Sequence, residues 1–142
     1  MIWAIHEDHQ WKNGLDKQMS LINDNDTIFK PWLDKYKYFD RFPEKNQEFY
    51  KNQCSKFLKK YNEMVSSKSF LLGESLMLAD AAIFPFVRQC AHIDLEWFEN
   101  SFPYLNQWLD AWKKSNLFLS VMNKYQEWRP ENSLEIINFN KN

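Results

Sequence analysis

Glycine is scarce in this sequence, because only Gly14 and Gly73 occur among its 142 residues. Loops that bind phosphate need several glycines, since their backbone has to approach the ligand closely. Tight turns between β-strands also rely on glycine, which adopts backbone angles that other residues avoid. The composition therefore disfavours nucleotide-binding loops and hairpin-rich β folds. We expect Gly73, in the connection 68–74, to adopt a positive φ angle.

Excess charge and long apolar runs are missing as well. Lysine and arginine total 18 against 19 aspartate and glutamate, a net charge of −1. That balance provides no electrostatic attraction for nucleic acid. No apolar run approaches the roughly 18–20 residues of a membrane span. The N-terminal stretch MIWAIHEDHQW has neither a basic flank nor a small-residue cleavage site, so it is not typical of a signal peptide. We expect a cytoplasmic protein that binds neither nucleic acid nor membrane.

Cysteine is also rare, with Cys54 and Cys90 lying far apart inside helical patterns. We expect two free thiols that act as small apolar residues in a reducing cytosol. A disulfide between them is the alternative that the spacing favours less.

Apolar and aromatic residues are plentiful, at 44% and 18% of the chain. That content argues against disorder, and a chain of this length fits one domain with a substantial core. Residues 44–66 show the clearest pattern, with apolar side chains at three- and four-residue steps and lysines between them. This spacing predicts a long amphipathic helix. Its apolar side carries Tyr50, Cys54, Phe57, Leu58, Tyr61 and Val65.

The N-terminal part has weaker helical patterns. Residues 2–8 resemble the middle of a helix, and 15–22 carry apolar residues at helical spacing. The Asn/Asp cluster at 23–26 predicts a turn that caps the following segment. An aromatic loop is expected at 36–43.

Residues 78–92 are apolar almost all round, which predicts a central, buried helix. Pro85 lies inside it, and an internal proline predicts a kink. Two more helices are predicted at 103–114 and 116–125, with Ser115 capping the second. The fold class is therefore all-α, a bundle of about five to seven helices. One domain is expected over residues 1–129, followed by a polar C-terminal tail over 130–142.

One region indicates a family. Residues 70–94 read FLLGESLMLADAAIFPFVRQCAHID, in which a glycine and a polar spacer precede Leu-Ala-Asp and a long apolar run. Further on come PYLNQWLDAW and SNLFLSVMNKY, then Trp128. Together they resemble the all-helical C-terminal domain of cytosolic glutathione S-transferases, and the match runs from residue 1 to about 128. The stretch NDNDTIFKPWLDKYKYFDRFPE is similar to a bacterial branch of that family.

The resemblance gives Asp80 a structural role. In the family, a Ser or Thr cap and an Asp three residues on form a capping box at the start of the central helix. Here Asp80 can accept a hydrogen bond from the N–H of residue 77 and suits the positive end of the helix dipole. The cap position departs from the family, because Met77 is a poor acceptor and half of the box is lost.

The resemblance also implies what is missing. Complete family members activate glutathione, their co-substrate, through a thioredoxin-like N-terminal domain, which we expect to be absent here. Met1 is then an internal start, a cut fragment or the remnant of a split gene. We expect no catalytic residue and no cofactor in this chain, and whether it is an enzyme at all stays open.

The family's pocket for the electrophile lies on the first and central helices of this domain. By resemblance, Trp3, Phe86 and Arg88 are the residues expected on that face. Left uncovered, such a face favours a homodimer or binding of the missing thioredoxin-like domain. The implied function is to shape that pocket and a dimer interface in a glutathione-conjugating transferase. The alternatives are a non-catalytic protein-interaction module and a truncated remnant.

No metal site is expected. His6 and His9 have no evident third ligand and suit an exposed polar face. Asp24 and Asp26 lack the glycine and the closing glutamate of a calcium loop, so a capping turn is the better interpretation. His92 lies near a helix C-terminus, where the helix dipole favours a protonated imidazole.

Overall fold

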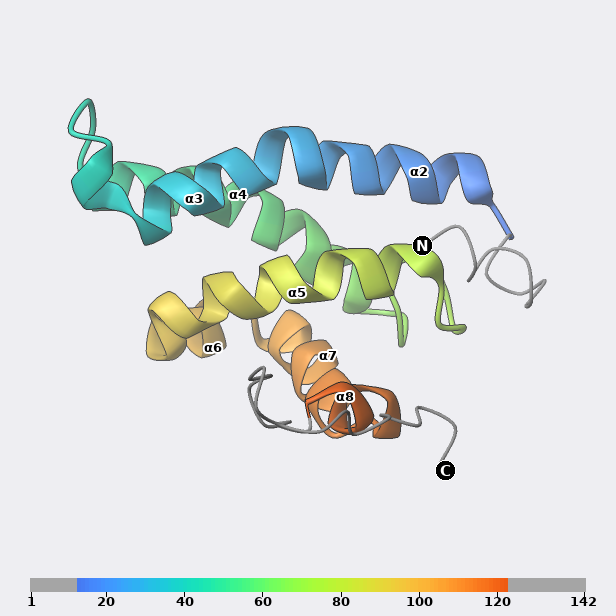
Figure 1. The fold of residues 1–142 in the computed structure, drawn as a ribbon. Helices are drawn as coiled ribbons and strands as arrows, with labels where there is room; N and C mark the ends of the chain where they lie inside the picture. Colours follow the sequence, from blue (N-terminus) through green and yellow to red (C-terminus); the bar gives the residue numbers. More distant parts are fainter. Residues whose placement is uncertain (1–12, 123–142) are drawn as a thin grey trace, which may run out of the picture.

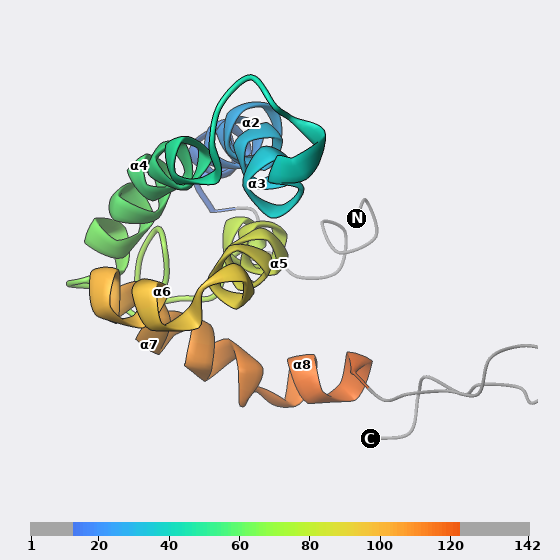
Figure 2. The same ribbon diagram turned by 90° about the vertical axis from the view of Figure 1, so that its left-hand side faces the viewer.

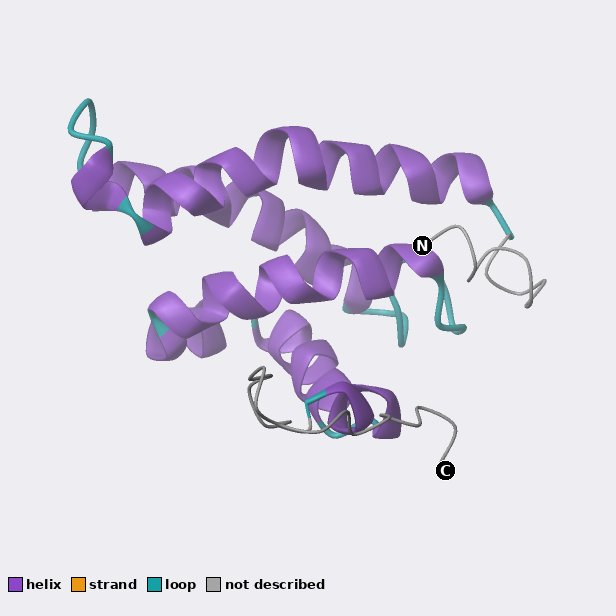
Figure 3. Ribbon diagram, viewed as in Figure 1, coloured by secondary structure: helices purple, strands orange, loops and turns teal. Residues whose placement is uncertain are grey.

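The computed structural model describes residues 13–122, and the regular structure in that range is helical (Figure 1; Figure 3). Between those limits, the only pairing of strand type is an isolated bridge between Phe70 and Gly73. The predicted all-α class is confirmed. The helix predicted at 2–8 and the tail at 130–142 lie outside the described residues.

Most elements follow one another with short connections. The elements are α2 (Leu15–Asp24), the π-helical turn η2 (Asn25–Phe29), α3 (Lys30–Lys37), the 3-10 turn η3 (Phe39–Arg41), α4 (Gln47–Val65), α5 (Leu78–Ile93), α6 (Leu95–Ser101), α7 (Pro103–Lys113) and α8 (Asn116–Val121). The longest connection of the described range, residues 66–77, joins α4 to α5.

The turn predicted at 23–26 is wrong, because α2, η2 and α3 follow without a break as one long helical rod (Figure 1). At η2 the backbone widens, and the Lys30 N–H donates to the Asn25 carbonyl, five residues back. Asn25 is buried there and accepts a hydrogen bond from the Tyr61 hydroxyl at 3.1 Å. Phe29 is fully buried one turn later. Tertiary contacts of these two side chains keep the segment helical despite its turn-forming residues.

Helix α4 confirms the amphipathic helix predicted at 44–66. It begins after Asn46, whose side chain accepts a hydrogen bond from the Phe49 N–H at 2.8 Å. Its far end supports α7, because the Asn62 side chain accepts a hydrogen bond from the Leu105 N–H at 2.9 Å. The buried side carries Tyr50, Cys54, Leu58, Tyr61 and Val65.

Helix α5 lies between the α2–α3 rod and α7, and it packs against both (Figure 2). Most of its residues are buried, so the predicted central helix is confirmed. It continues through Pro85, which lies on an exposed side of the helix. The proline therefore does not end the helix.

The positive φ angle predicted at Gly73 is wrong. Gly14, just before α2, has φ 62°, and no other residue of the described range has a positive φ. Gly73 instead lies in a short turn, where its carbonyl accepts a hydrogen bond from the Phe70 N–H at 2.9 Å. That turn closes without a left-handed residue.

The C-terminal helices are short. α6 was not predicted, and it begins after Asp94, whose side chain accepts from the Trp97 N–H at 3.1 Å. Ser115 caps α8 as predicted, because its hydroxyl accepts from the Phe118 N–H at 3.2 Å. No helix within residues 13–122 combines the length and hydropathy that a membrane span requires.

Candidate functional site

Of the sequence-predicted pocket residues, Phe86 and Arg88 lie on different sides of α5. Phe86 is half-buried and packs against the core. Arg88 is two positions further along α5, so the two side chains project about 200° apart around the helix. Trp3 lies outside the described residues.

Arg88 lies in an aromatic cluster at the junction of α5, α7 and α8. Its guanidinium is 5.4 Å from the centre of the Phe118 ring. Phe84, one turn earlier on α5, meets Phe118 edge-on at 5.5 Å and stacks on Trp112 at 5.1 Å. Within residues 13–122 the Arg88 Nε and the Trp112 Nε1 are buried without a hydrogen-bond partner. Unpaired buried donors are rare in folded proteins.

The surroundings of Arg88 are positively charged. The pKa of His92 is lowered, first by partial burial and then by the charges of Lys113 and Arg88. This outcome is the reverse of the expectation that the helix dipole favours the protonated imidazole. Burial of the ring, which is the largest cause, and the two neighbouring cations together outweigh the effect of the dipole on the pKa.

Asp80 is a fully buried carboxylate at the start of α5. It accepts hydrogen bonds from the Met77 N–H at 3.0 Å, the Leu71 N–H at 2.9 Å and the Trp108 indole N–H at 3.3 Å. The bond from residue 77 is the one that the sequence predicts. Burial raises the pKa of Asp80, while the three donors act in the opposite direction. The carboxylate thus joins a loop, α5 and α7, and it does not point into a cleft.

Gln18 takes over part of the role of the missing cap. Its side-chain oxygen accepts from the Ala79 N–H at 3.0 Å, and its amide donates to the Asn13 carbonyl at 2.9 Å. The side chain is fully buried between α2 and α5. Met77 leaves the first turn of α5 short of a strong acceptor, and Gln18 supplies one from 61 residues away. A partner so distant in sequence gives no local signal.

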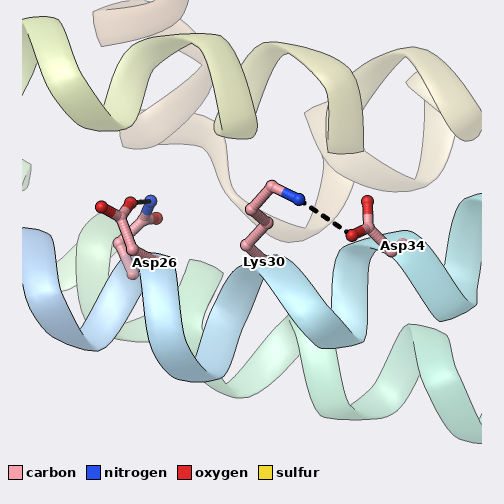
Figure 4. A network of polar contacts seen from close by, with 4 residues as sticks. Asp26, Lys30 and Asp34 are labelled. Carbon is pink, nitrogen blue, oxygen red and sulfur yellow. Dashed lines mark hydrogen bonds and ion pairs between the residues drawn. The ribbon is translucent and has the colours of Figure 1, made fainter.

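A polar stripe runs along the α2–α3 rod through Asp26, Lys30 and Asp34 (Figure 4). Lys30 Nζ lies 3.0 Å from the Asp34 carboxylate, and both side chains are nearly half exposed. Asp26 accepts a hydrogen bond from the Asn25 amide at 3.3 Å. An exposed pair at this spacing adds little to stability. The stripe is therefore a solvated polar face of the rod.

The basic residues that follow Asp34 lie on aromatic rings. The Lys35 ammonium is 5.2 Å from the Trp32 ring centre, and the Arg41 guanidinium is 4.7 Å from that of Tyr38. Tyr36 is almost fully buried, and burial raises the pKa of its hydroxyl well above the ordinary value. These residues belong to the stretch that is similar to the bacterial branch of the family, and their role here is to pack against neighbouring side chains.

The two cysteines are free and fully buried, as the sequence predicts. A hydrogen bond with the Cys54 thiol, together with burial, raises the pKa of Cys90 well above its ordinary value. A thiol that stays protonated is a poor nucleophile and a poor metal ligand. In the part of the chain that the structure describes, no three His, Cys, Asp or Glu residues are grouped as metal ligands. His6 and His9 lie outside that part.

Large apolar side chains are exposed on α8 and just after it. About half or more of each is accessible to solvent, in contrast to the buried side chains of α5. They are Leu117, Leu119, Val121 and Met122. This exposed apolar surface lies on α8, whereas the resemblance predicts the uncovered face on the first and central helices.

Comparison with known proteins gives one match. Residues 44–111 match the family described as "Glutathione S-transferase, C-terminal domain". The matched range extends from the loop before α4 into α7 and includes Asp80 and Arg88. No curated protein and no solved structure gives a significant match to the chain.

Proposed function

We propose, from the match of residues 44–111 to the glutathione S-transferase C-terminal domain, that the chain serves as this domain in a glutathione S-transferase-like protein. In that role it shapes the pocket that receives the electrophile in a glutathione-conjugating transferase. It also contributes to a dimer interface. The buried free thiols suit a cytoplasmic location.

The aromatic cluster around Arg88 is the observation that carries the pocket proposal. Electrophiles conjugated by such enzymes are often flat rings with electron-withdrawing substituents, which stack well on Phe and Trp. The Arg88 side chain adds a cation and an unpaired donor beside those rings. A polar substituent of the ring, such as a nitro group, supplies the acceptor that Arg88 otherwise lacks.

The pocket can be tested with 2,4-dinitroaniline, a ring of this type without a leaving group. Its binding should quench tryptophan fluorescence of the 142-residue protein. We expect Arg88→Ala to weaken binding, because the variant loses the donor and the charge. Lys56→Ala is the matched control, since Lys56 is exposed on α4, away from the cluster. Equal affinity of the two variants would rule out Arg88 as a pocket residue.

We further propose that the isolated chain does not activate glutathione. Activation needs a Ser, Tyr or Cys placed beside the thiol of glutathione to lower its pKa. Both cysteines of this chain are buried, as are Tyr36, Tyr50 and Tyr61. Tyr38 and Tyr104 are exposed, but they lie on the helical domain, whereas the family resemblance puts the activating residue on the thioredoxin-like domain. Conjugation of glutathione to 1-chloro-2,4-dinitrobenzene should therefore proceed at the uncatalysed rate, as followed by absorbance. Acceleration proportional to protein concentration would refute this part of the proposal.

The exposed apolar side chains of α8 support a second candidate function, a non-catalytic protein-interaction module. The two functions predict different binding partners for the purified chain. Retention on immobilised glutathione favours the transferase role, whereas retention of one defined protein partner in stoichiometric amount favours the module.

A further inference from the structure

The two cysteines of the chain lie together in the core, although they come from different helices. Cys54 is on α4 and Cys90 is on α5, and both side chains are fully buried. The thiols of Cys54 and Cys90 share a hydrogen bond, so the two sulfur atoms are neighbours. Thiols that meet from separate elements fulfil the first requirement of a disulfide, which is proximity.

A third helix completes the surroundings of the thiol pair. Tyr36 of α3 is buried beside both cysteines, and the pKa of its hydroxyl is raised first by burial and then by nearby groups that include Cys90 and Cys54. α3 itself packs against both α4 and α5. The pair is therefore held between three helices, away from solvent.

Oxidation of a pair of thiols ends differently from oxidation of a single thiol. A hydroperoxide converts one thiolate to a sulfenic acid. If no second thiol is in reach, further oxidant carries the sulfur to sulfinic and sulfonic acids, which thiols do not reduce. If a second thiol is in reach, the sulfenic acid condenses with it to a disulfide, which thiols do reduce.

We propose that Cys54 and Cys90 form a reversible disulfide when the protein meets a hydroperoxide such as hydrogen peroxide. The sulfur of one thiolate attacks a peroxide oxygen, so an S–O bond forms while the O–O bond breaks, and the departing hydroxide takes the thiol proton and leaves as water. The second thiolate attacks the sulfenic sulfur, an S–S bond replaces the S–O bond, and hydroxide leaves with the second thiol proton as water. In total, two thiols are oxidised by two electrons, and one peroxide is reduced to two molecules of water.

The environment that pairs the thiols also makes the reaction slow. The shared hydrogen bond and burial raise the pKa of Cys90, so little thiolate is present while the helices are closed. Oxidation therefore needs α4 and α5 to separate briefly. The product joins α4 directly to α5, which are otherwise linked by the connection 66–77. The pair thus ends prolonged exposure to peroxide in a state that a thiol reductant reverses.

The pairing is tested by treating the 142-residue protein with hydrogen peroxide in urea below its unfolding transition, which admits the oxidant. The protein is then unfolded, and the remaining thiols are alkylated with iodoacetamide. The oxidised monomer should take up no alkyl group, and proteolysis should give a peptide that joins Cys54 to Cys90. Dithiothreitol should restore both thiols. Thiols that stay free, disulfide-linked dimers, or thiols lost without a joined peptide overturn the proposal.

Cys54→Ala combined with Asn52→Cys is the matched control, because it keeps two thiols in the chain. Asn52 is exposed on α4, about 200° around the helix from Cys54, so the new thiol projects away from Cys90. In this variant Cys90 has no partner, and peroxide should carry it to a sulfinic acid that dithiothreitol does not reverse. A joined peptide formed as fast as in the wild type would show that pairing does not depend on the native positions, and the proposal would fail.

The fit of the disulfide to the folded core is tested by equilibrium with oxidised and reduced dithiothreitol. The ratio of disulfide to dithiol protein is measured in native buffer and in concentrated urea. We expect the folded protein to favour the disulfide about 100-fold more than the unfolded chain, equivalent to about 2.7 kcal/mol. An equal or smaller ratio in the folded protein contradicts the fit. Because dithiothreitol replaces glutathione, the result does not depend on whether the chain serves in a glutathione-conjugating enzyme.

Discussion

At the scale of single residues, Gln18 shows how a distant side chain compensates for a weak helix cap. Met77 offers the first turn of α5 only a thioether, which is a weak acceptor. Gln18 provides an amide oxygen from α2 and is fully buried in doing so. The start of α5 is thereby linked to α2, which lies far from it in the sequence.

Replacing Gln18 with leucine should destabilise the protein by about 1–3 kcal/mol, because the Ala79 N–H is then buried without an acceptor. The free energy of unfolding in urea measures the effect. Lys17→Ala, an exposed change one residue away, serves as control and should stay within about 0.5 kcal/mol of the wild type. A Gln18→Leu variant as stable as this control would show that the bond contributes nothing.

Asp80 and Asp94 should affect stability with opposite dependence on pH. The pKa of Asp80 is raised by burial, so its contribution is fully present below the ordinary value of 3.8 and is lost as the pH rises through the folded pKa. The pKa of Asp94 is lowered by its bond to Lys51, so its contribution is present above 3.8 and is lost as the pH falls through the folded pKa.

Comparison of Asp80→Asn and Asp94→Asn with the wild type tests this difference. The stability lost in Asp80→Asn should be larger in acid than at neutral pH, whereas the loss in Asp94→Asn should be larger at neutral pH. Urea unfolding at a series of pH values gives both curves. If the stability losses of the two variants changed with pH in the same direction, the opposite pKa shifts of Asp80 and Asp94 would be contradicted.

At the scale of elements, Pro85 is the clearest departure from regular structure in α5. Proline removes one backbone donor, so the carbonyl of Ala81 loses its usual partner. Pro85→Ala restores that donor at an exposed position and should stabilise the protein by about 1–3 kcal/mol. The midpoint of thermal unfolding should rise. A lower midpoint would mean that packing of α5 depends on the proline.

Helices with a strong pattern were predictable from the sequence, and those that depend on tertiary contacts were not. The three- and four-residue steps of α4 and the apolar run of α5 gave both helices within a few residues. The cluster at 23–26 has the composition of a cap, but the buried pair of Asn25 and Tyr61 keeps it helical. α6 spans only Leu95–Ser101, which is too short for its period to be recognised.

The candidate site was predictable to a similar extent. Asp80 was found because its partner at residue 77 is three positions away in the sequence. The family resemblance pointed to Arg88, but its contact with Phe118 joins two helices whose packing no local pattern reveals. The bond from Leu71 to Asp80 and the bond between Gln18 and Ala79 escaped prediction for the same reason.

At the scale of the whole molecule, the exposed apolar end of the bundle should lead to self-association. Leu119 and Val121 are 54% and 69% exposed, and burying them against a second copy removes apolar surface from water. We expect a dimer whose fraction rises with protein concentration in light scattering. Leu119→Glu combined with Val121→Glu should give a monomer. Asn52→Glu, at an exposed position on α4, adds charge of the same sign away from α8 and should leave the dimer. A wild-type monomer at all concentrations would contradict the expectation.

The burial of Cys54 and Cys90 has a practical consequence. No other cysteine occurs in the chain, so the native protein presents no accessible thiol to a modifying reagent. Reaction then requires the core between α4 and α5 to open, and the rate of thiol labelling measures how often it does so. A cysteine introduced on the surface can therefore carry a spectroscopic label alone, while the two native thiols report on opening of the core in the same molecule.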